Sequence, residues 1–76
     1  MGRVPPVKPA DAIRVFEQLG YAVDRRRGSH IVMKKPGATR PLVVPDHTEL
    51  AIGTLRSNLR SAGISVDEFL ERLRAL

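Results

Sequence analysis

The sequence has 76 residues, of which 42% are hydrophobic and 28% are charged, and it contains no Cys and no Trp. This length allows one domain, and the hydrophobic content is that of a folded domain rather than a disordered segment. Without Cys the chain has neither a disulfide framework nor a thiolate zinc site. It also lacks an apolar run of the roughly 18–20 residues that span a membrane, and the apolar stretch of a secretory signal. We therefore expect a cytoplasmic protein that does not associate with membranes.

Basic residues are concentrated in the middle of the chain. The net charge is +5, with 13 Lys and Arg against 8 Asp and Glu. Residues 21–40 contain six of these basic residues and a single acidic residue, Asp24, so they carry the whole excess. A local positive field attracts phosphate groups and accelerates association with polyanions. The block predicts a polyanionic partner; a solvated surface strip is the alternative.

Residues 1–7 show no hydrophobic period, and we expect them to form a flexible N-terminal lead to a single domain at residues 8–76. Pro9 suits the first turn of a helix, where its missing N–H has no helical partner. Three apolar residues that follow share one helical face: they are Ile13, Phe16 and Leu19. Gly20 favours the left-handed conformation that commonly ends a helix. This pattern predicts a helix over residues 9–19.

Three short strands are predicted after this helix, at residues 21–27, 30–35 and 42–44. Their β-branched and apolar residues favour extended structure. Gly28-Ser29 and Pro36-Gly37 are turn dipeptides, so the strands are expected to form an antiparallel meander. Proline on both sides of the third run favours an edge strand there.

Two further helices are predicted at the end of the chain. Apolar residues recur at helical spacing before Gly63: they are Leu50, Ile52, Leu55, Leu59 and Ala62. Ser65 and Glu68 then form a capping-box pattern that opens a helix over residues 66–76. The apolar side of this last helix is formed by Phe69, Leu70, Leu73 and Leu76. The order α-β-β-β-α-α predicts an α+β fold, with helices on one face of a three-stranded antiparallel sheet and the other face open.

Alternation of side chains along the second strand predicts which residues face solvent. Ile31 and Met33 form one set and are expected to face the helices. His30, Val32 and Lys34 form the other set and are expected on the open face. Imidazole exchanges protons near neutral pH, so an exposed His30 is a candidate general acid or base, although a half-exposed strand histidine without a role is the alternative.

Two small residues precede this histidine. Gly28 and Ser29 leave the backbone beside His30 sterically bare, which allows close approach of a ligand backbone.

His47 is the other histidine, and its position between a proline and the next helix favours a loop or capping role. Gly53-Thr54 lacks the further glycines and the Lys of a phosphate-binding loop.

Several short motifs, in this order along residues 8–73, resemble the HicA toxin family. They are Gly28-Ser29-His30, Pro36-Gly37, Val44-Pro45-Asp46-His47, Gly53-Thr54-Leu55-Arg56-Ser57-Asn58-Leu59 and Ala62-Gly63-Ile64. The resemblance implies a fold like the double-stranded-RNA-binding domain and an mRNA interferase of a type II toxin–antitoxin pair, neutralised by a HicB antitoxin. It also implies that His30 is the catalytic histidine. The chain departs from the family pattern in having Ile31 after this histidine and in continuing into a third helix.

The leading hypothesis is a ribonuclease that cleaves mRNA without a metal or other cofactor. His30 would act as the base, and Arg26, Lys34 and Lys35 would contact phosphates together with the small residues at 28 and 29. His47 is a candidate general acid. We expect a monomer when free and a hetero-oligomer with an acidic, HicB-like antitoxin.

Two other functions fit the same composition. A non-catalytic RNA-binding module would use the same basic block, and an interaction subunit would use it for an acidic protein. Phe16, Tyr21 and Phe69 are the three aromatic residues, and two of them lie on apolar helix faces. This placement argues against a sheet that stacks bases and favours recognition of phosphate and shape.

Overall fold

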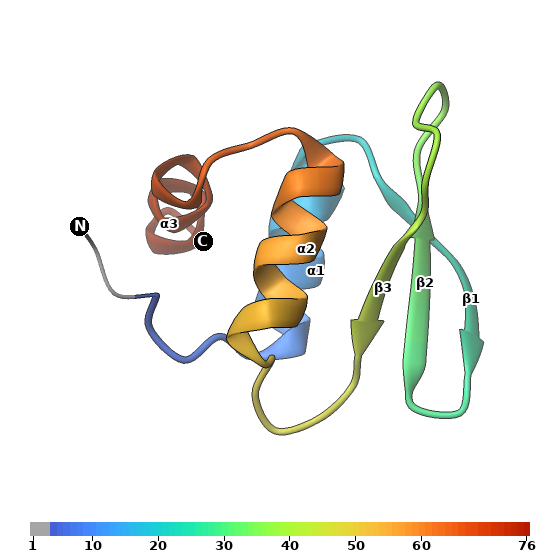
Figure 1. The fold of residues 1–76 in the computed structure, drawn as a ribbon, viewed down its shortest axis with the longest axis horizontal. Helices are drawn as coiled ribbons and strands as arrows, with labels where there is room; N and C mark the ends of the chain where they lie inside the picture. Colours follow the sequence, from blue (N-terminus) through green and yellow to red (C-terminus); the bar gives the residue numbers. More distant parts are fainter. Residues whose placement is uncertain (1–3) are drawn as a thin grey trace.

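Six helices and strands make up the protein in a computed structural model that describes residues 4–76. They are α1 (Pro9–Gln18), β1 (Ala22–Arg27), β2 (His30–Lys34), β3 (Leu42–Pro45), α2 (Ile52–Ala62) and α3 (Val66–Arg74). The strands form one antiparallel sheet in the order β1-β2-β3. Figure 1 shows α1 and α2 on one side of this sheet and α3 on the far side of those two helices. The structure confirms the predicted α+β class and order.

Local sequence signals explain the helix ends. α1 begins with proline in its first turn, and Gly20 follows its C-terminus with φ of 99°. The hydroxyl of Ser65 accepts a hydrogen bond from the N–H of Glu68 at 3.0 Å and caps α3. Gly63 ends α2 in the left-handed conformation, with φ of 76°. Ser65 and the two glycines satisfy backbone groups that a helix terminus leaves without intrahelical partners, and the proline lacks an N–H that would have had none.

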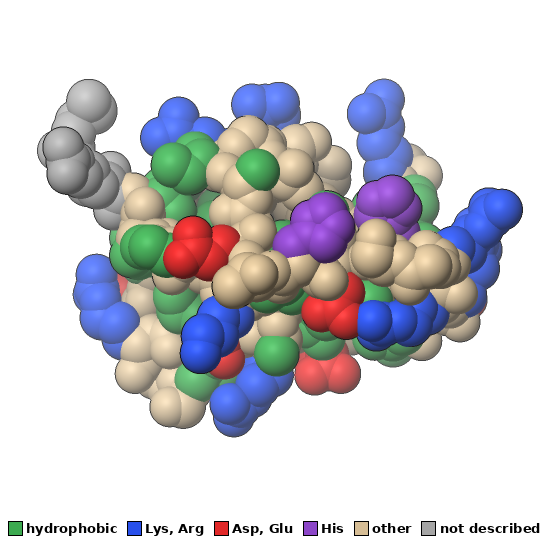
Figure 2. Space-filling view, turned by 90° about the horizontal axis from the view of Figure 1, so that it is seen from below, with side chains coloured by type: hydrophobic (Ala, Val, Ile, Leu, Met, Phe, Trp, Pro, Cys, Tyr) green, Lys and Arg blue, Asp and Glu red, His purple; other side chains and the backbone are tan. Residues whose placement is uncertain are grey.

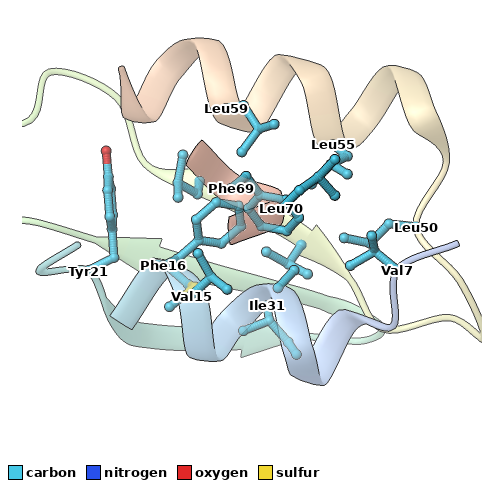
Figure 3. Close-up of a cluster of buried hydrophobic side chains, with 14 residues drawn as sticks. Val7, Val15, Phe16, Tyr21, Ile31, Leu50, Leu55, Leu59, Phe69 and Leu70 are labelled. Atoms are coloured by element: carbon cyan, nitrogen blue, oxygen red, sulfur yellow. The ribbon is translucent and has the colours of Figure 1, made fainter. Parts of the chain in front are cut away.

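The core lies between the sheet and the helices, and its centre is aromatic. Phe16 contacts Tyr21 edge-on, with ring centroids 6.4 Å apart, and lies 6.0 Å from the ring of Phe69 (Figure 3). Ile31 and Met33 of β2 belong to this core, as the alternation predicts, whereas Val32, which the alternation predicts on the open face, is also buried but lies outside this cluster. Phe69 is fully buried, so α3 is part of the folded unit rather than an appendage.

The first residue of α2 departs from its predicted environment. Ile52 is 53% exposed, although its spacing predicts a buried side chain. The helix begins at this residue, beyond the end of the core, and Leu50 of the preceding loop fills that end instead. The N–H of Leu50 donates to the carbonyl oxygen of Val7 at 2.9 Å, and Val7 is buried.

Other residues of the predicted N-terminal lead also touch the core. Val4 is partly buried and packs against it, as do the partly buried residues of the first helix. Residues 1–3 of the predicted lead lie outside the described residues. In the first helix, Val15 is fully buried although the predicted apolar face omitted it.

An extra residue in β1 decides which arginines share a face with His30. The pairing of β1 with β2 shifts between Val23 and Arg25, so Asp24 is a bulge residue. Beyond the bulge, Arg27 lies opposite His30, and Arg26 lies opposite Ile31, which is a core residue. Because residues that face each other across strands point to the same side, Arg25 and Arg27 lie on the open face. Arg26 lies on the side of the helices.

Candidate functional site

His30 is the first residue of β2 and follows directly on a tight turn. Gly28 has φ of 59° in this turn, and no residue other than glycine has a positive φ within the described chain. A positive φ at the first central position alone is the pattern of a type II′ turn, which matches the twist of a hairpin. The turn presents His30 as an exposed side chain at the end of the sheet. Its cross-strand neighbours are Arg27 on β1 and Pro45 on β3.

The side chain of His30 lines a groove of about 490 Å³ between β3 and α2. The strand side of the groove is formed by Pro41, Val43 and Pro45, and Arg40 lines it as well. The helix side consists of small or polar residues: Gly53, Thr54, Ser57, Asn58 and Ser61. Hydroxyl and amide groups therefore line one wall, and this wall can exchange hydrogen bonds with a polar ligand.

Asn58 holds the two walls together. It is 7% exposed, and its Nδ2 donates to the carbonyl oxygen of Val43 at 3.2 Å. This hydrogen bond ties α2 to the outer edge of β3, which has no neighbouring strand on that side within the described residues. The floor of the groove is thus fixed at its middle, between the His30 end and the Arg40 end.

A second hollow of about 460 Å³ lies beside the groove and is basic. It is lined by Arg25, Lys34, Lys35, Ala38, Thr39, Arg40 and Pro41. Arg40 and Pro41 also line the groove of His30, so the two hollows adjoin. Lys34 and Lys35, predicted as phosphate contacts, line this second hollow rather than the groove.

Ion pairs engage several of the basic residues of the central block. Asp24 of the bulge lies 3.2 Å from Arg25 and 3.6 Å from Lys34. Arg26 pairs with Asp46 on the side of the helices. Among the described residues, no acidic side chain lies within 4.0 Å of the cationic groups of Arg27 or Arg40, in contrast to these pairs.

Lys35 has a partner of another kind. Its ammonium lies 5.6 Å from the centre of the Tyr21 ring, and its aliphatic stem passes beside Gly20. A cation over an aromatic face is stabilised by the ring quadrupole. This interaction orients Lys35 toward the junction of α1 and β1.

Comparison with protein families identifies the chain. The family model described as HicA toxin of bacterial toxin–antitoxin matches residues 9–64. The chain belongs to the HicA toxin family. It therefore belongs with the toxins of bacterial toxin–antitoxin systems, for which the family implies an antitoxin partner. No curated protein matches the sequence.

The match with the HicA family contains all the groove residues and ends before α3. The lining residues of the groove run from His30 to Ser61, inside residues 9–64. α3 begins at Val66, so the core contribution of Phe69 comes from outside the matched segment.

Only some of the residues predicted for the site of this HicA toxin lie close together in the structure. His30, Gly28 and Ser29 lie together at the tip of the hairpin, whereas the Arg26 side chain lies on the other face. His47 is exposed on the loop between β3 and α2 and does not line the groove. Figure 2 shows both histidine side chains on one face of the molecule, with basic side chains around it both at the end where the sheet lies and over the helices.

Sequence reasoning missed the groove and the residues that shape it. Arg27 and Arg40 belong to the basic block but were not singled out, because the bulge and the adjoining hollows are not visible in the sequence. The hydroxyl residues of α2 gave a signal, since Thr54, Ser57 and Ser61 share one helical face. The part of the chain that the structure describes brings no three His, Asp or Glu side chains together as metal ligands. It also contains no helix long and apolar enough to cross a membrane.

Proposed function

We propose that this HicA-family toxin is a metal-independent endoribonuclease that cleaves mRNA, with His30 as its general base. The observation that carries the proposal is the position of His30, which is exposed at the end of a polar groove with Arg27 directly across the strand pair. The resemblance of Gly28-Ser29-His30 to the family motif supports the same residue. A base and a nearby cation are the groups that cleavage of an RNA strand requires.

The reaction uses the ribose itself as nucleophile. His30 removes the proton of a 2′-hydroxyl, and the resulting oxyanion attacks the adjacent phosphorus. The bond from phosphorus to the 5′-oxygen of the next nucleotide breaks, which leaves a cyclic phosphate on one fragment. The 5′-oxygen takes a proton, either from water in the open groove or from His47. DNA lacks the 2′-hydroxyl and is not cleaved by this route.

Cations of the open face would stabilise the charge that develops on the phosphate. Arg27 is the cross-strand partner of His30 in the sheet. Its guanidinium has no carboxylate partner among residues 4–76. Lys34 and Lys35 remain proposed contacts for phosphates farther along the strand. Guanidinium and ammonium groups held at such a surface favour the more negative transition state over the substrate.

Cleavage of mRNA by the purified protein in the presence of EDTA tests the proposal. The wild type should cleave, and His30→Ala should lose about 10²–10⁴-fold in rate while it retains fold and RNA binding. His47→Ala tests the other histidine: a loss of activity would assign the proton of the 5′-oxygen to His47, and unchanged activity would assign it to water. Cleavage by His30→Ala within threefold of the wild type would remove His30 from the mechanism.

The same assay separates the alternative functions. A non-catalytic RNA-binding module would bind the RNA, leave it intact and respond equally to both histidine variants. A protein-interaction subunit would neither bind nor cleave it. The groove contains no Phe, Tyr or Trp among its described lining residues, which favours binding of the sugar-phosphate backbone over base stacking and predicts lax sequence preference.

A further inference from the structure

Two adjoining hollows lie on the surface between His30 and Lys34. They are the groove between β3 and α2 and the basic hollow, and Arg40 and Pro41 line both. The groove has a wall of hydroxyl and amide groups, and the basic hollow is lined by cations. A polar wall followed by a basic hollow suits the sugar-phosphate backbone of a nucleic acid.

Arg40 lies where the two hollows meet, at the end of the groove remote from His30. Pro45 is the cross-strand partner of His30, and Arg40 precedes it by five positions along nearly extended chain. At about 3.3 Å per residue, the backbone of Arg40 is up to roughly 16 Å from that of Pro45. The two residues therefore address different points of any strand that follows the groove.

The charge of Arg40 is free to meet a ligand. Its side chain is exposed, and no carboxylate pairs with it within the described chain, whereas Arg25 and Lys34 in the same hollow share Asp24. The guanidinium fork is suited to bind phosphate oxygens through two parallel hydrogen bonds. An unpaired fork at the junction of the two hollows is a good anchor for a phosphate.

We propose that the two adjoining hollows form a track for one strand of RNA and that Arg40 is a positioning residue that anchors a phosphate a few nucleotides from the one cleaved. The proposal rests on the ribonuclease function above. A stacked strand advances about 3.4 Å per nucleotide, so the span from His30 to Arg40 corresponds to a few nucleotides. Binding at the remote phosphate holds the scissile one against His30.

This arrangement makes the effect of Arg40 depend on substrate length. A dinucleotide that occupies the His30 end cannot reach Arg40, so Arg40→Ala should leave its cleavage unchanged. An RNA of about ten nucleotides, within the range that single-strand binding surfaces cover, reaches both points. For this substrate Arg40→Ala should raise KM about tenfold and change kcat less, because it removes a charge-assisted hydrogen bond that substrate and transition state share. Arg40→Lys should restore part of the affinity.

Arg60→Ala is the matched control. Arg60 lies on α2 but lines a different hollow, toward α3, so its removal changes the net charge equally without touching the track. Equal effects of Arg40→Ala and Arg60→Ala would reduce the role of Arg40 to net charge and overturn the proposal. An equal effect of Arg40→Ala on the dinucleotide and the longer RNA would overturn it as well.

Binding of a 2′-O-methyl RNA of the same length separates this proposal from the ribonuclease function. Such an RNA has no free 2′-hydroxyl to attack the phosphate, so affinity is measured without cleavage. Arg40→Ala should weaken binding about tenfold and reduce the salt slope by roughly 0.7. If the wild type cleaves no RNA but Arg40→Ala weakens binding in this way, the track stands and the proposed reaction fails. If the wild type cleaves RNA and Arg40→Ala binds normally, the track fails alone.

Discussion

Asn58 of α2 donates a hydrogen bond to the carbonyl oxygen of Val43 in β3, at 3.2 Å. Val43 lies on an edge strand, so within the described sheet this carbonyl has no strand partner on its outer side. The amide side chain takes that place and fixes the helix beside the strand. The groove that His30 lines lies between these two elements, which this hydrogen bond joins.

Replacing Asn58 by alanine should therefore destabilise the protein and loosen the groove. The hydrogen bond that it removes is part-buried, and such bonds contribute about 0.5–1.5 kcal/mol net. For a domain of this size 1 kcal/mol lowers the melting temperature by about 4–8 °C. Thermal denaturation measures the effect, and Ser57→Ala, which changes an exposed neighbour in the same groove, is the control. Equal melting temperatures for both variants would show that the hydrogen bond has no net stabilising effect.

Arg26 and Arg27 are adjacent in sequence and should differ in activity. Arg27 lies across from His30 on the open face, while Arg26 pairs with Asp46 on the side of the helices. We expect Arg27→Ala to lower kcat at least tenfold, since removing one group that stabilises transition-state charge costs about 10²–10³-fold at an enclosed site and less at an open one. Arg26→Ala should stay within about threefold of the wild type. The reverse order in single-turnover cleavage would place the phosphate on the other face.

Lys34 and Lys35 line the basic hollow, and together they should set part of the salt dependence of RNA binding. The double variant Lys34→Ala/Lys35→Ala should reduce the slope of log affinity against log salt by roughly 0.7 for each phosphate that it no longer neutralises. Because Lys34 pairs with Asp24 and Lys35 lies over Tyr21, we expect a reduction closer to that for one phosphate than for two. A slope equal to that of the wild type would show that neither lysine meets the nucleic acid.

The control for this experiment lies in α3. Arg74→Ala changes an exposed cation remote from both hollows, and it should leave the salt slope unaltered. Arg72 is a poorer control because its guanidinium is engaged with Glu68 at 3.2 Å and with Gln18 at 3.4 Å, so its removal also disturbs the packing of α3.

The order of helices and strands followed from the sequence because each element carries its own local signals. Gly28, Gly63 and the cap at Ser65 act within a few residues of the ends they define, and apolar spacing reports the buried face directly. The exposed side chain of His30 followed in the same way, from alternation along β2 and from the turn before it.

The sheet faces on which Arg26 and Arg27 lie could not be predicted from the sequence, because they depend on the pairing between strands. If β1 continued its alternation from the buried Tyr21, Arg26 would share the open face and Arg27 would face the helices. The bulge at Asp24 reverses this assignment. The groove likewise depends on the hydrogen bond of Asn58 with Val43, fifteen positions away, and no local pattern encodes such an interaction.

Phe69 should carry much of the stability that α3 contributes. Its ring is fully buried against Phe16, although α3 lies beyond the segment that matches the HicA family. Phe69→Ala should cost about 3–5 kcal/mol, and Phe69→Leu less, since a smaller cavity is left. Denaturant unfolding measures both, and the leucine variant keeps the comparison possible if the alanine variant does not fold. Costs below about 1 kcal/mol would show that α3 is dispensable for the core.

An antitoxin is expected to act on the surface around His30. The groove is open, and the segment that connects its two walls, residues 46–51, is short. Inhibition by a second protein is therefore the simplest control of the proposed nuclease. The surface to be covered carries the basic block, so we expect the cover to be acidic and to associate more slowly as salt rises.

Hydrogen exchange on the free toxin and on its complex with its antitoxin tests this mode of inhibition. β1 is an edge strand of the described sheet, so the amides on its outer side have no strand partner there and exchange readily in the free protein. Direct cover of the site should protect residues 25–35, including these amides and the turn before His30. The rival arrangement is a partner that docks on α3 and inhibits at a distance. Protection confined to the surroundings of Phe69 and Leu73, with unchanged exchange at residues 25–35, would establish that arrangement and exclude direct occlusion.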